Sequence, residues 1–155
     1  MIGAAVGYTG GMNGLSPHAR WFGYAGLLPQ AAALVAIVHG GEARWSALVL
    51  AFGYAALIFS FLGGVWWGLA LAAPRVPRWV FGAAVLPSLI ALALWYPWAV
   101  GQTWPGPELV ALGLMIGGSP WVDRAIGFAP RGWMALRWQL SLGLGGLTVA
   151  TGLIG

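Results

Sequence analysis

The sequence predicts an all-α fold, a polytopic membrane bundle of five transmembrane helices. The first reason is composition, because 60% of the residues are hydrophobic, only 6% are charged and the mean hydropathy is +0.83. Soluble domains carry about 25% charged residues. The second reason is that the apolar residues form five long segments, each close to the roughly 20 residues that cross the hydrocarbon core of a bilayer. A protein embedded in lipid is therefore expected.

The connections between the expected spans are short. Each contains glycine, proline or charged residues, which end helices, and none is long enough to hold a second domain. We therefore expect residues 1–16 to form a flexible, glycine-rich N-terminal arm and residues 17–155 to form one transmembrane domain. The spans are predicted at residues 21–39, 46–73, 79–100, 107–126 and 133–154.

The first span is predicted to contain an irregularity near its middle. It opens with Ser16 and Pro17, a suitable N-cap and first helical residue. Further on, Pro29 leaves a backbone carbonyl without its helical partner, and Gln30 can bond to that carbonyl or to another helix. The sequence predicts either a kink or a polar joint at this point.

The second span carries small residues at every fourth position. Glycine, alanine and serine let two helix backbones approach closely in lipid, where hydrophobicity gives no driving force for association. We therefore expect this side of the helix to pack against another helix rather than against lipid. The row consists of Ala56, Ser60, Gly64, Gly68 and Ala72.

The later spans combine interfacial aromatics with helix-breaking residues. The third contains Pro87 and ends in residues 95–98, Trp-Tyr-Pro-Trp, whose aromatic rings suit the outer membrane interface. The fourth starts at Pro107 and contains residues 117–120, Gly-Gly-Ser-Pro, which are predicted to bend or break it. The fifth is predicted to present a small, polar face for packing, formed by Arg137, Ser141, Gly145, Thr148 and Gly152.

The cations are distributed very unevenly between the two expected sides of the membrane. Arg44 alone lies on the side opposite the N-terminus. Because Lys and Arg concentrate in cytoplasmic loops, the sequence predicts a bacterial inner-membrane protein with its N-terminus cytoplasmic and its C-terminus external. The cations expected on the cytoplasmic side are Arg20, Arg75, Arg78, Arg124, Arg131 and Arg137.

The sequence contains few residues that could form a catalytic site. There is no cysteine, which excludes disulfides and thiolate ligands, and the three acidic residues, Glu42, Glu108 and Asp123, form no facing pair for acid–base work. His18 and His39 lie about 30 Å apart if one helix joins them, too far to share a metal ion. No catalytic or metal-binding residue is predicted, an enzyme is not favoured, and any cofactor is left unknown.

The strongest polar candidate is the pair of Asp123 and Arg137. A short loop joins their spans, so the two side chains can meet at the cytoplasmic end of the bundle. This contact is either structural or part of a ligand site, and the alternative is that Arg137 extends its charge to the membrane interface without a partner.

Tryptophan is abundant, with 11 residues, and most of them fall at predicted membrane interfaces. Four lie deeper and are expected to converge toward the cytoplasmic half, near Gly63 and Gly64, where they either line a hydrophobic pocket or fill gaps beside glycine. These four are Trp66, Trp67, Trp121 and Trp138.

Three segments, residues 54–70, 86–89 and 130–137, resemble the transmembrane-protein-69-like family of bacteria and mitochondria, a domain of unknown function. The most specific part is Ser-Phe-Leu-Gly-Gly at residues 60–64, and the resemblance extends over residues 17–154. It implies a small multi-span inner-membrane protein and supplies no activity. Trp66 departs from the family pattern, in which many relatives have a polar or basic residue. The matching residues are Ser60, Gly63, Gly64, Trp67, Gly68, Pro87, Asp123, Trp133 and Arg137.

Two functions are consistent with these features. The first is a non-enzymatic accessory subunit or assembly factor of an energy-transducing complex, which packs against other membrane protein subunits or against itself within the lipid bilayer. The second is a binding or transport protein for a small hydrophobic or amphipathic ligand. Nucleic acid is not an expected partner, because the cations are too few and too dispersed. The candidate residues for ligand or partner binding are Ser60, Gly63, Gly64, Trp67, Gly68, Asp123 and Arg137.

Overall fold

The computed structural model describes residues 15–101, 104–127 and 132–155, and these residues form helices and short connections without any strand. Most of the predicted N-terminal arm and Arg131 therefore lie outside the described residues. The helices are α1 (Pro17–Ala25), α2 (Leu28–His39), α3 (Ala43–Ala72), α4 (Trp79–Ala99), α5 (Gly106–Ile126) and α6 (Trp133–Ile154).

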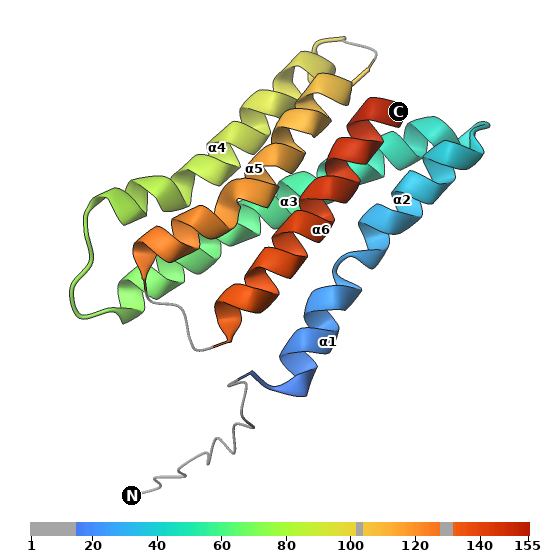
Figure 1. Cartoon of the computed structure of the whole chain (residues 1–155). Helices are drawn as coiled ribbons and strands as arrows, with labels where there is room; N and C mark the ends of the chain where they lie inside the picture. The colour runs from blue at the N-terminus through green and yellow to red at the C-terminus, as the bar shows by residue number, and fades with distance from the viewer. Residues whose placement is uncertain (1–14, 102–103, 128–131) are drawn as a thin grey trace, which may run out of the picture.

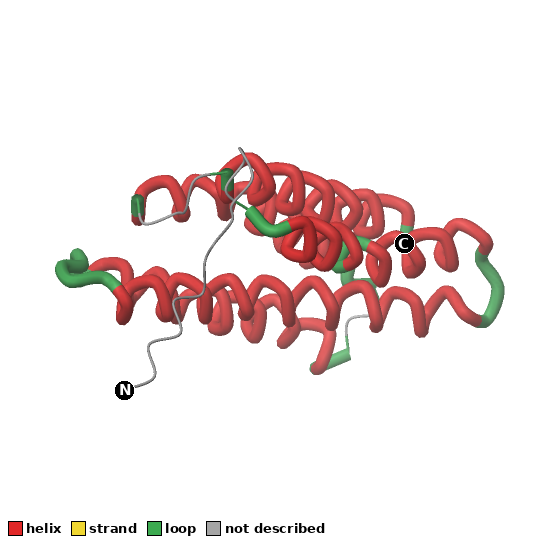
Figure 2. Tube along the Cα trace, turned by 90° about the horizontal axis from the view of Figure 1, so that it is seen from below, coloured by secondary structure: helices red, strands yellow, loops and turns green. Residues whose placement is uncertain are grey.

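The long helices run antiparallel to their neighbours in the chain (Figure 1), while α1 and α2 follow one another in the same general direction. Seen from below, the helices lie in two layers (Figure 2). The C-terminal end of α6 lies beside the start of α3, where the Arg44 guanidinium donates to the backbone oxygen of Ile154 at 3.0 Å. The start of α1, the connection from α3 to α4 and the end of α5 gather at the opposite end of the bundle.

Four helical units in the described part of the chain are long and apolar enough to cross a membrane, which is compatible with a membrane protein. The predicted fifth span is not supported by this criterion. The helix itself is present, since α6 runs over 22 residues, but it contains arginine, glutamine, threonine and glycine residues and is not among the helices that meet the criterion. The four candidate spans are Pro17–His39, Ala43–Ala72, Trp79–Ala99 and Gly106–Ile126.

The predicted irregularity in the first span is an interruption between two helices, in the turn that precedes Pro29. The helical hydrogen bonding is interrupted at Gly26 and Leu27, whose backbone angles remain in the right-handed helical region. Pro29 occupies the first turn of α2, where it has no N–H to donate to the Ala25 carbonyl at the end of α1. The alternative of a polar joint is not observed, because the Gln30 side chain is fully buried and bonds to no other group that the structure describes. The predicted N-cap is confirmed, since the Ser16 hydroxyl accepts from the Ala19 N–H at 3.2 Å.

A break at residues 117–120 does not occur, because α5 continues through this segment to Ile126, and the alternative of a bend stays a prediction. Pro120 has no N–H to donate to the carbonyl of Ile116, four residues earlier. The Ser119 hydroxyl donates to that carbonyl instead, at 2.6 Å, and all three residues are buried. The serine beside the proline therefore satisfies the group that the proline leaves free.

Glycine permits the closest helix contacts in the bundle. A Cβ atom added to Gly113 of α5 would lie 2.7 Å from the carbonyl oxygen of Gly145 in α6, and one added to Gly145 would lie 2.6 Å from that of Gly113. In the same way, Gly63 of α3 faces the Ala84 carbonyl of α4. The predicted small face of the fifth segment is confirmed, because Arg137, Ser141, Gly145, Thr148 and Gly152 are all buried.

Candidate functional site

The centre of the candidate site is a buried ion pair between α5 and α6. The Nε atom of Arg137 lies 2.7 Å from Oδ2 of Asp123. Only 6% of Arg137 and 2% of Asp123 is exposed. The predicted contact between these residues is therefore present, and the alternative of an unpaired arginine extended to the interface is wrong.

Three further polar groups complete a cluster around the ion pair. The Trp66 indole N–H donates to Oδ1 of Asp123 at 2.8 Å. The two terminal nitrogens of Arg137 donate to the hydroxyls of Ser141 at 2.6 Å and Ser119 at 3.0 Å. We call these five residues, Trp66, Ser119, Asp123, Arg137 and Ser141, the polar cluster.

The polar cluster joins three helices that are distant in sequence. Trp66 belongs to α3, Ser119 and Asp123 to α5, and Arg137 and Ser141 to α6. Each partner of a buried ion pair depends on the other, because removal of one leaves an uncompensated buried charge and costs about 3–5 kcal/mol. The cluster therefore acts as a specific connection among α3, α5 and α6.

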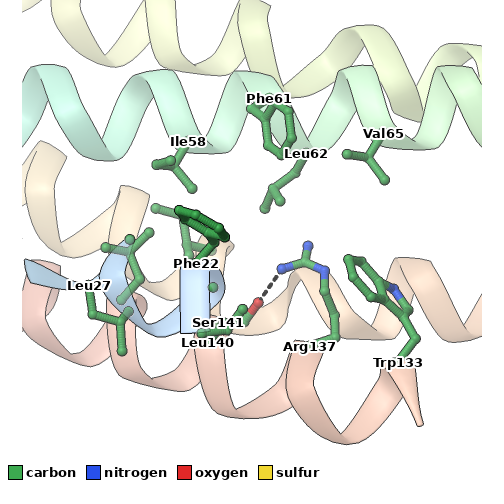
Figure 3. A pocket seen from close by; sticks show the side chains of 14 residues that line it. Phe22, Leu27, Ile58, Phe61, Leu62, Val65, Trp133, Arg137, Leu140 and Ser141 are labelled. Atoms are coloured by element: carbon green, nitrogen blue, oxygen red, sulfur yellow. Dashed lines mark hydrogen bonds between the residues drawn. The ribbon is translucent and has the colours of Figure 1, made fainter. Parts of the chain in front are cut away.

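Beside the cluster lies an apolar hollow of about 230 Å³ between α1, α3 and α6. Figure 3 shows the Arg137 side chain rising from α6 toward the residues of α3, with Ser141 and Trp133 on either side of it. Apart from the arginine and the serine, the lining is apolar or glycine. The aromatic and aliphatic walls are formed by Phe22, Leu27, Ile58, Phe61, Leu62, Val65, Ile116, Trp133, Leu140 and Leu144.

The predicted small-residue row of α3 has a different environment from the one expected. Gly64 and Gly68 are exposed, and no atom lies within 4 Å of a Cβ added to either residue, so they make no helix–helix contact within the described chain. Ser60 is half-buried. The reason is that Trp66 lies almost opposite Gly64 on the helix, and the inward position of this indole turns the small row outward.

Of the remaining candidates on α3, Gly63 is inside and Trp67 is outside. Gly63 is buried against the backbone of α4. Trp67 is 42% exposed and packs edge-to-face on Phe81 of α4, with ring centroids 5.2 Å apart. The seven predicted candidates thus fall into a buried pair, Asp123 and Arg137, and a group on α3 that does not contact that pair.

The four deeper tryptophans do not line one pocket. Trp66 is buried in the polar cluster, whereas Trp121 and Trp138 form an edge-to-face pair with centroids 5.4 Å apart. The sequence reasoning missed Trp66, Ser119 and Ser141 as members of the site. The signal for Trp66 was present in its position, since a buried indole N–H needs an acceptor and Asp123 is the only acidic residue that the sequence predicts away from the external side.

The cluster offers hydrogen-bond donors and compensated charge, and no nucleophile–base pair is formed within it. Among the residues described, no group of three or more His, Asp or Glu side chains is positioned to hold a metal ion. The cluster is suited to holding helices together and to donating hydrogen bonds toward the adjacent hollow.

The fold and the site define a small helical protein compatible with a membrane, in which a buried arginine–carboxylate pair joins three helices. Residues 15–153 match the family described as Protein of unknown function (DUF3429), and the chain therefore belongs to this family. No curated protein and no solved structure matches the chain.

Proposed function

We propose that the protein is an accessory subunit or assembly factor that binds another membrane protein through the outward face of α3. The observation that carries this proposal is the pair Gly64 and Gly68, which are exposed and have open space where side chains would lie. We call Ser60, Gly64 and Gly68 the small-residue face. The partner is a transmembrane helix of a different protein, packed closely against this face.

The way in which the chain uses its other glycines supports the proposal. Gly63, Gly113 and Gly145 are buried at points where a neighbouring backbone leaves no room for a side chain. Gly64 and Gly68 meet no such neighbour in the described chain, although glycine inside a helix costs about 1 kcal/mol relative to alanine. A close helix in the assembled complex would give these positions the same packing role.

We further propose that α6 crosses the bilayer as a fifth span. Its polar side chains bind groups of the same chain. Arg137 pairs with Asp123, and the Thr148 hydroxyl donates to the Leu144 carbonyl at 2.8 Å. Polar groups satisfied in this way cost less in lipid than an average hydropathy suggests. This supports a polytopic inner-membrane protein of the kind that the transmembrane-protein-69-like resemblance implies.

The proposed orientation is cytoplasmic for the N-terminus and external for the C-terminus, in the inner membrane of a bacterium. The arginine distribution supports it, because Arg44 is the one arginine of the described residues at the end of the bundle where α6 finishes. The antiparallel order of the long helices in Figure 1 is the one that consecutive membrane spans require in either orientation.

The test is copurification from native membranes with Gly64→Leu. Because a leucine at this position has open space within the chain, the variant is expected to fold and melt like the parent but to lose at least 90% of the copurifying membrane protein. Gly82→Leu is the matched control, since Gly82 is also exposed with nothing within 4 Å. Equal recovery with both variants would contradict the proposal, and recovery of the chain alone as a dimer would show self-association instead.

A second candidate function is the binding of a small hydrophobic or amphipathic molecule. The observation that favours it is the apolar hollow of about 230 Å³ with the Arg137 guanidinium at its edge. Ligand sites are commonly concave and mostly apolar, with a few polar groups that orient the ligand. The test is whether native-lipid purification yields a bound small molecule that is lost when the hollow is filled.

A further inference from the structure

We infer that the hollow between α1, α3 and α6 binds an uncharged amphiphile whose head carries a carbonyl oxygen. This inference rests on the second candidate function and is independent of the first. Three features of the described residues support it: the shape of the hollow, the free donors of Arg137 and the balance of charge in the polar cluster.

The break between α1 and α2 forms one wall of the hollow. After the chain leaves the helix at Gly26, the Tyr54 hydroxyl of α3 donates to the Gly26 carbonyl, while the Tyr24 hydroxyl of α1 donates to the Gln139 side chain of α6. The C-terminal end of α1 is thus connected to α6. Phe22 of α1 and Phe61 of α3 lie across from each other at the hollow (Figure 3).

The size of the hollow suits a ring or the first part of a chain. An apolar cavity of about 150 Å³ already admits benzene, and this hollow measures about 230 Å³. Phe22 and Phe61 are 78% and 65% exposed, so the hollow reaches the outer surface of the bundle. A long apolar tail can therefore extend from the hollow into the surrounding lipid.

The polar end of the hollow supplies donors rather than acceptors. Arginine has five N–H groups and no acceptor. In this structure Nε faces Asp123, one terminal nitrogen donates to Ser141 and the other donates to Ser119. Each terminal nitrogen therefore keeps a second N–H, and a ligand head that meets the guanidinium has to accept a hydrogen bond.

The charge balance of the cluster excludes a charged head. The Arg137 cation is compensated by the Asp123 carboxylate at 2.7 Å, and both residues are buried. An anionic head would place two negative groups on one guanidinium in a medium of low dielectric constant, and a cationic head would meet the arginine itself. A carbonyl oxygen accepts from the free N–H groups without adding charge.

The test uses the purified protein in lipid nanodiscs and four probes with the same chain of twelve carbons. They are 2-dodecanone, which has an uncharged carbonyl, dodecanoate, dodecyltrimethylammonium and dodecane, each at the same mole fraction in the bilayer. We expect 2-dodecanone alone to raise the midpoint of thermal unfolding in a saturable manner, because a ligand that binds only the folded state stabilises it.

Two variants locate the binding site. Val65→Trp is expected to fill the hollow and abolish the shift with 2-dodecanone, whereas Val85→Trp, at an exposed position on α4, is expected to retain it. Arg137→Lys keeps the cation but removes the planar guanidinium. In this variant 2-dodecanone is expected to raise the midpoint of thermal unfolding no more than dodecane does. If Arg137→Lys does not fold, the Val65 and Val85 variants still decide whether the probe binds in this hollow.

The outcomes separate the inference from the function on which it rests. If no probe changes the midpoint, the second candidate function is wrong and the inference falls with it. If dodecanoate, dodecyltrimethylammonium or dodecane matches 2-dodecanone, the hollow binds ligands but the assignment of an uncharged carbonyl head is wrong. Displacement of the ketone by decylubiquinone rather than by dioleoylglycerol would identify a quinone, and the reverse result would identify a lipid ester.

Discussion

At the scale of single residues, the ion pair of Asp123 and Arg137 is the contact on which the packing of α5 and α6 is expected to depend most. Arg137→Ala and Asp123→Ala should each lower the free energy of unfolding by about 3–5 kcal/mol, because either change leaves a buried charge unpaired. The double variant should lose less than the sum of the two. Unfolding followed in detergent measures these losses.

A matched control for the ion pair is Arg124→Ala. Arg124 adjoins Asp123 in α5 but is exposed, so its removal should change the free energy of unfolding by about 0.5 kcal/mol or less. Additive losses in the Asp123 and Arg137 double variant would show that the two residues do not depend on each other.

Trp66 gives the second prediction at this scale. Trp66→Phe keeps a buried aromatic ring but removes the N–H that donates to Asp123 at 2.8 Å. The expected loss is about 1–2 kcal/mol in the free energy of unfolding, as for a hydrogen bond to a charged group within a membrane helix bundle. Trp67→Phe, one residue on and 42% exposed, should have little effect. Equal losses in both variants would mean that the indole N–H does not matter.

The composition of the polar cluster was only partly predictable from the sequence. Asp123 and Arg137 were predicted as a pair because a short loop brings the ends of their helices together. Trp66 was not predicted as a member of the cluster. Its contact with Asp123 depends on how α3 is rotated against α5, and spacing along one helix does not determine that rotation. The same rotation explains why Gly64 and Gly68 face outward rather than into the bundle.

At the scale of the helices, α5 shows how a proline is tolerated in the interior of a bundle. Ser119→Ala should destabilise the protein by about 1–3 kcal/mol, since the buried Ile116 carbonyl would lose its donor. In the Pro120→Ala background the backbone N–H of residue 120 can replace that donor. The cost of Ser119→Ala should therefore be smaller there, leaving mainly the lost contact with Arg137.

Thermal or denaturant unfolding of the four proteins, parent, both single variants and the double variant, tests this coupling. A cost of Ser119→Ala that is the same with and without Pro120 would contradict the role assigned to the serine hydroxyl. The prediction of a break in this segment failed for the same reason. It considered the proline and glycines individually and did not consider the neighbouring serine as a donor.

The existence and approximate limits of the long helices followed from hydropathy, because long apolar segments in lipid have few alternatives to a helix. The break between α1 and α2 was expected nearby, at Pro29 and Gln30. In the structure Pro29 instead begins a helix, as proline readily does in a first turn. The interruption nevertheless follows from Pro29, because α1 ends at Ala25, whose carbonyl has no proline N–H to accept from, and the Tyr54 hydroxyl binds the next carbonyl, that of Gly26.

At the scale of the whole molecule, the last prediction is that α6 crosses the bilayer as a fifth span. If α6 crosses the bilayer, alkaline phosphatase fused after Gly155 should be active outside a bacterial cell, and a fluorescent protein fused there should be dark. Fusions at Gly101 and Gly127, at the ends of α4 and α5, serve as internal references. The first should report an external position and the second a cytoplasmic one, in accordance with the arginine distribution.

The reference fusions separate two ways in which this topology can fail. A cytoplasmic C-terminus with both references as expected would mean that α6 does not cross and that its buried polar face packs on α5 without spanning the membrane. Reversal of all three reporters would mean that five spans are present in the opposite orientation. Only an external C-terminus together with an external Gly101 and a cytoplasmic Gly127 is consistent both with the proposed orientation and with a fifth span that Arg137 and Asp123 stabilise from within the bundle.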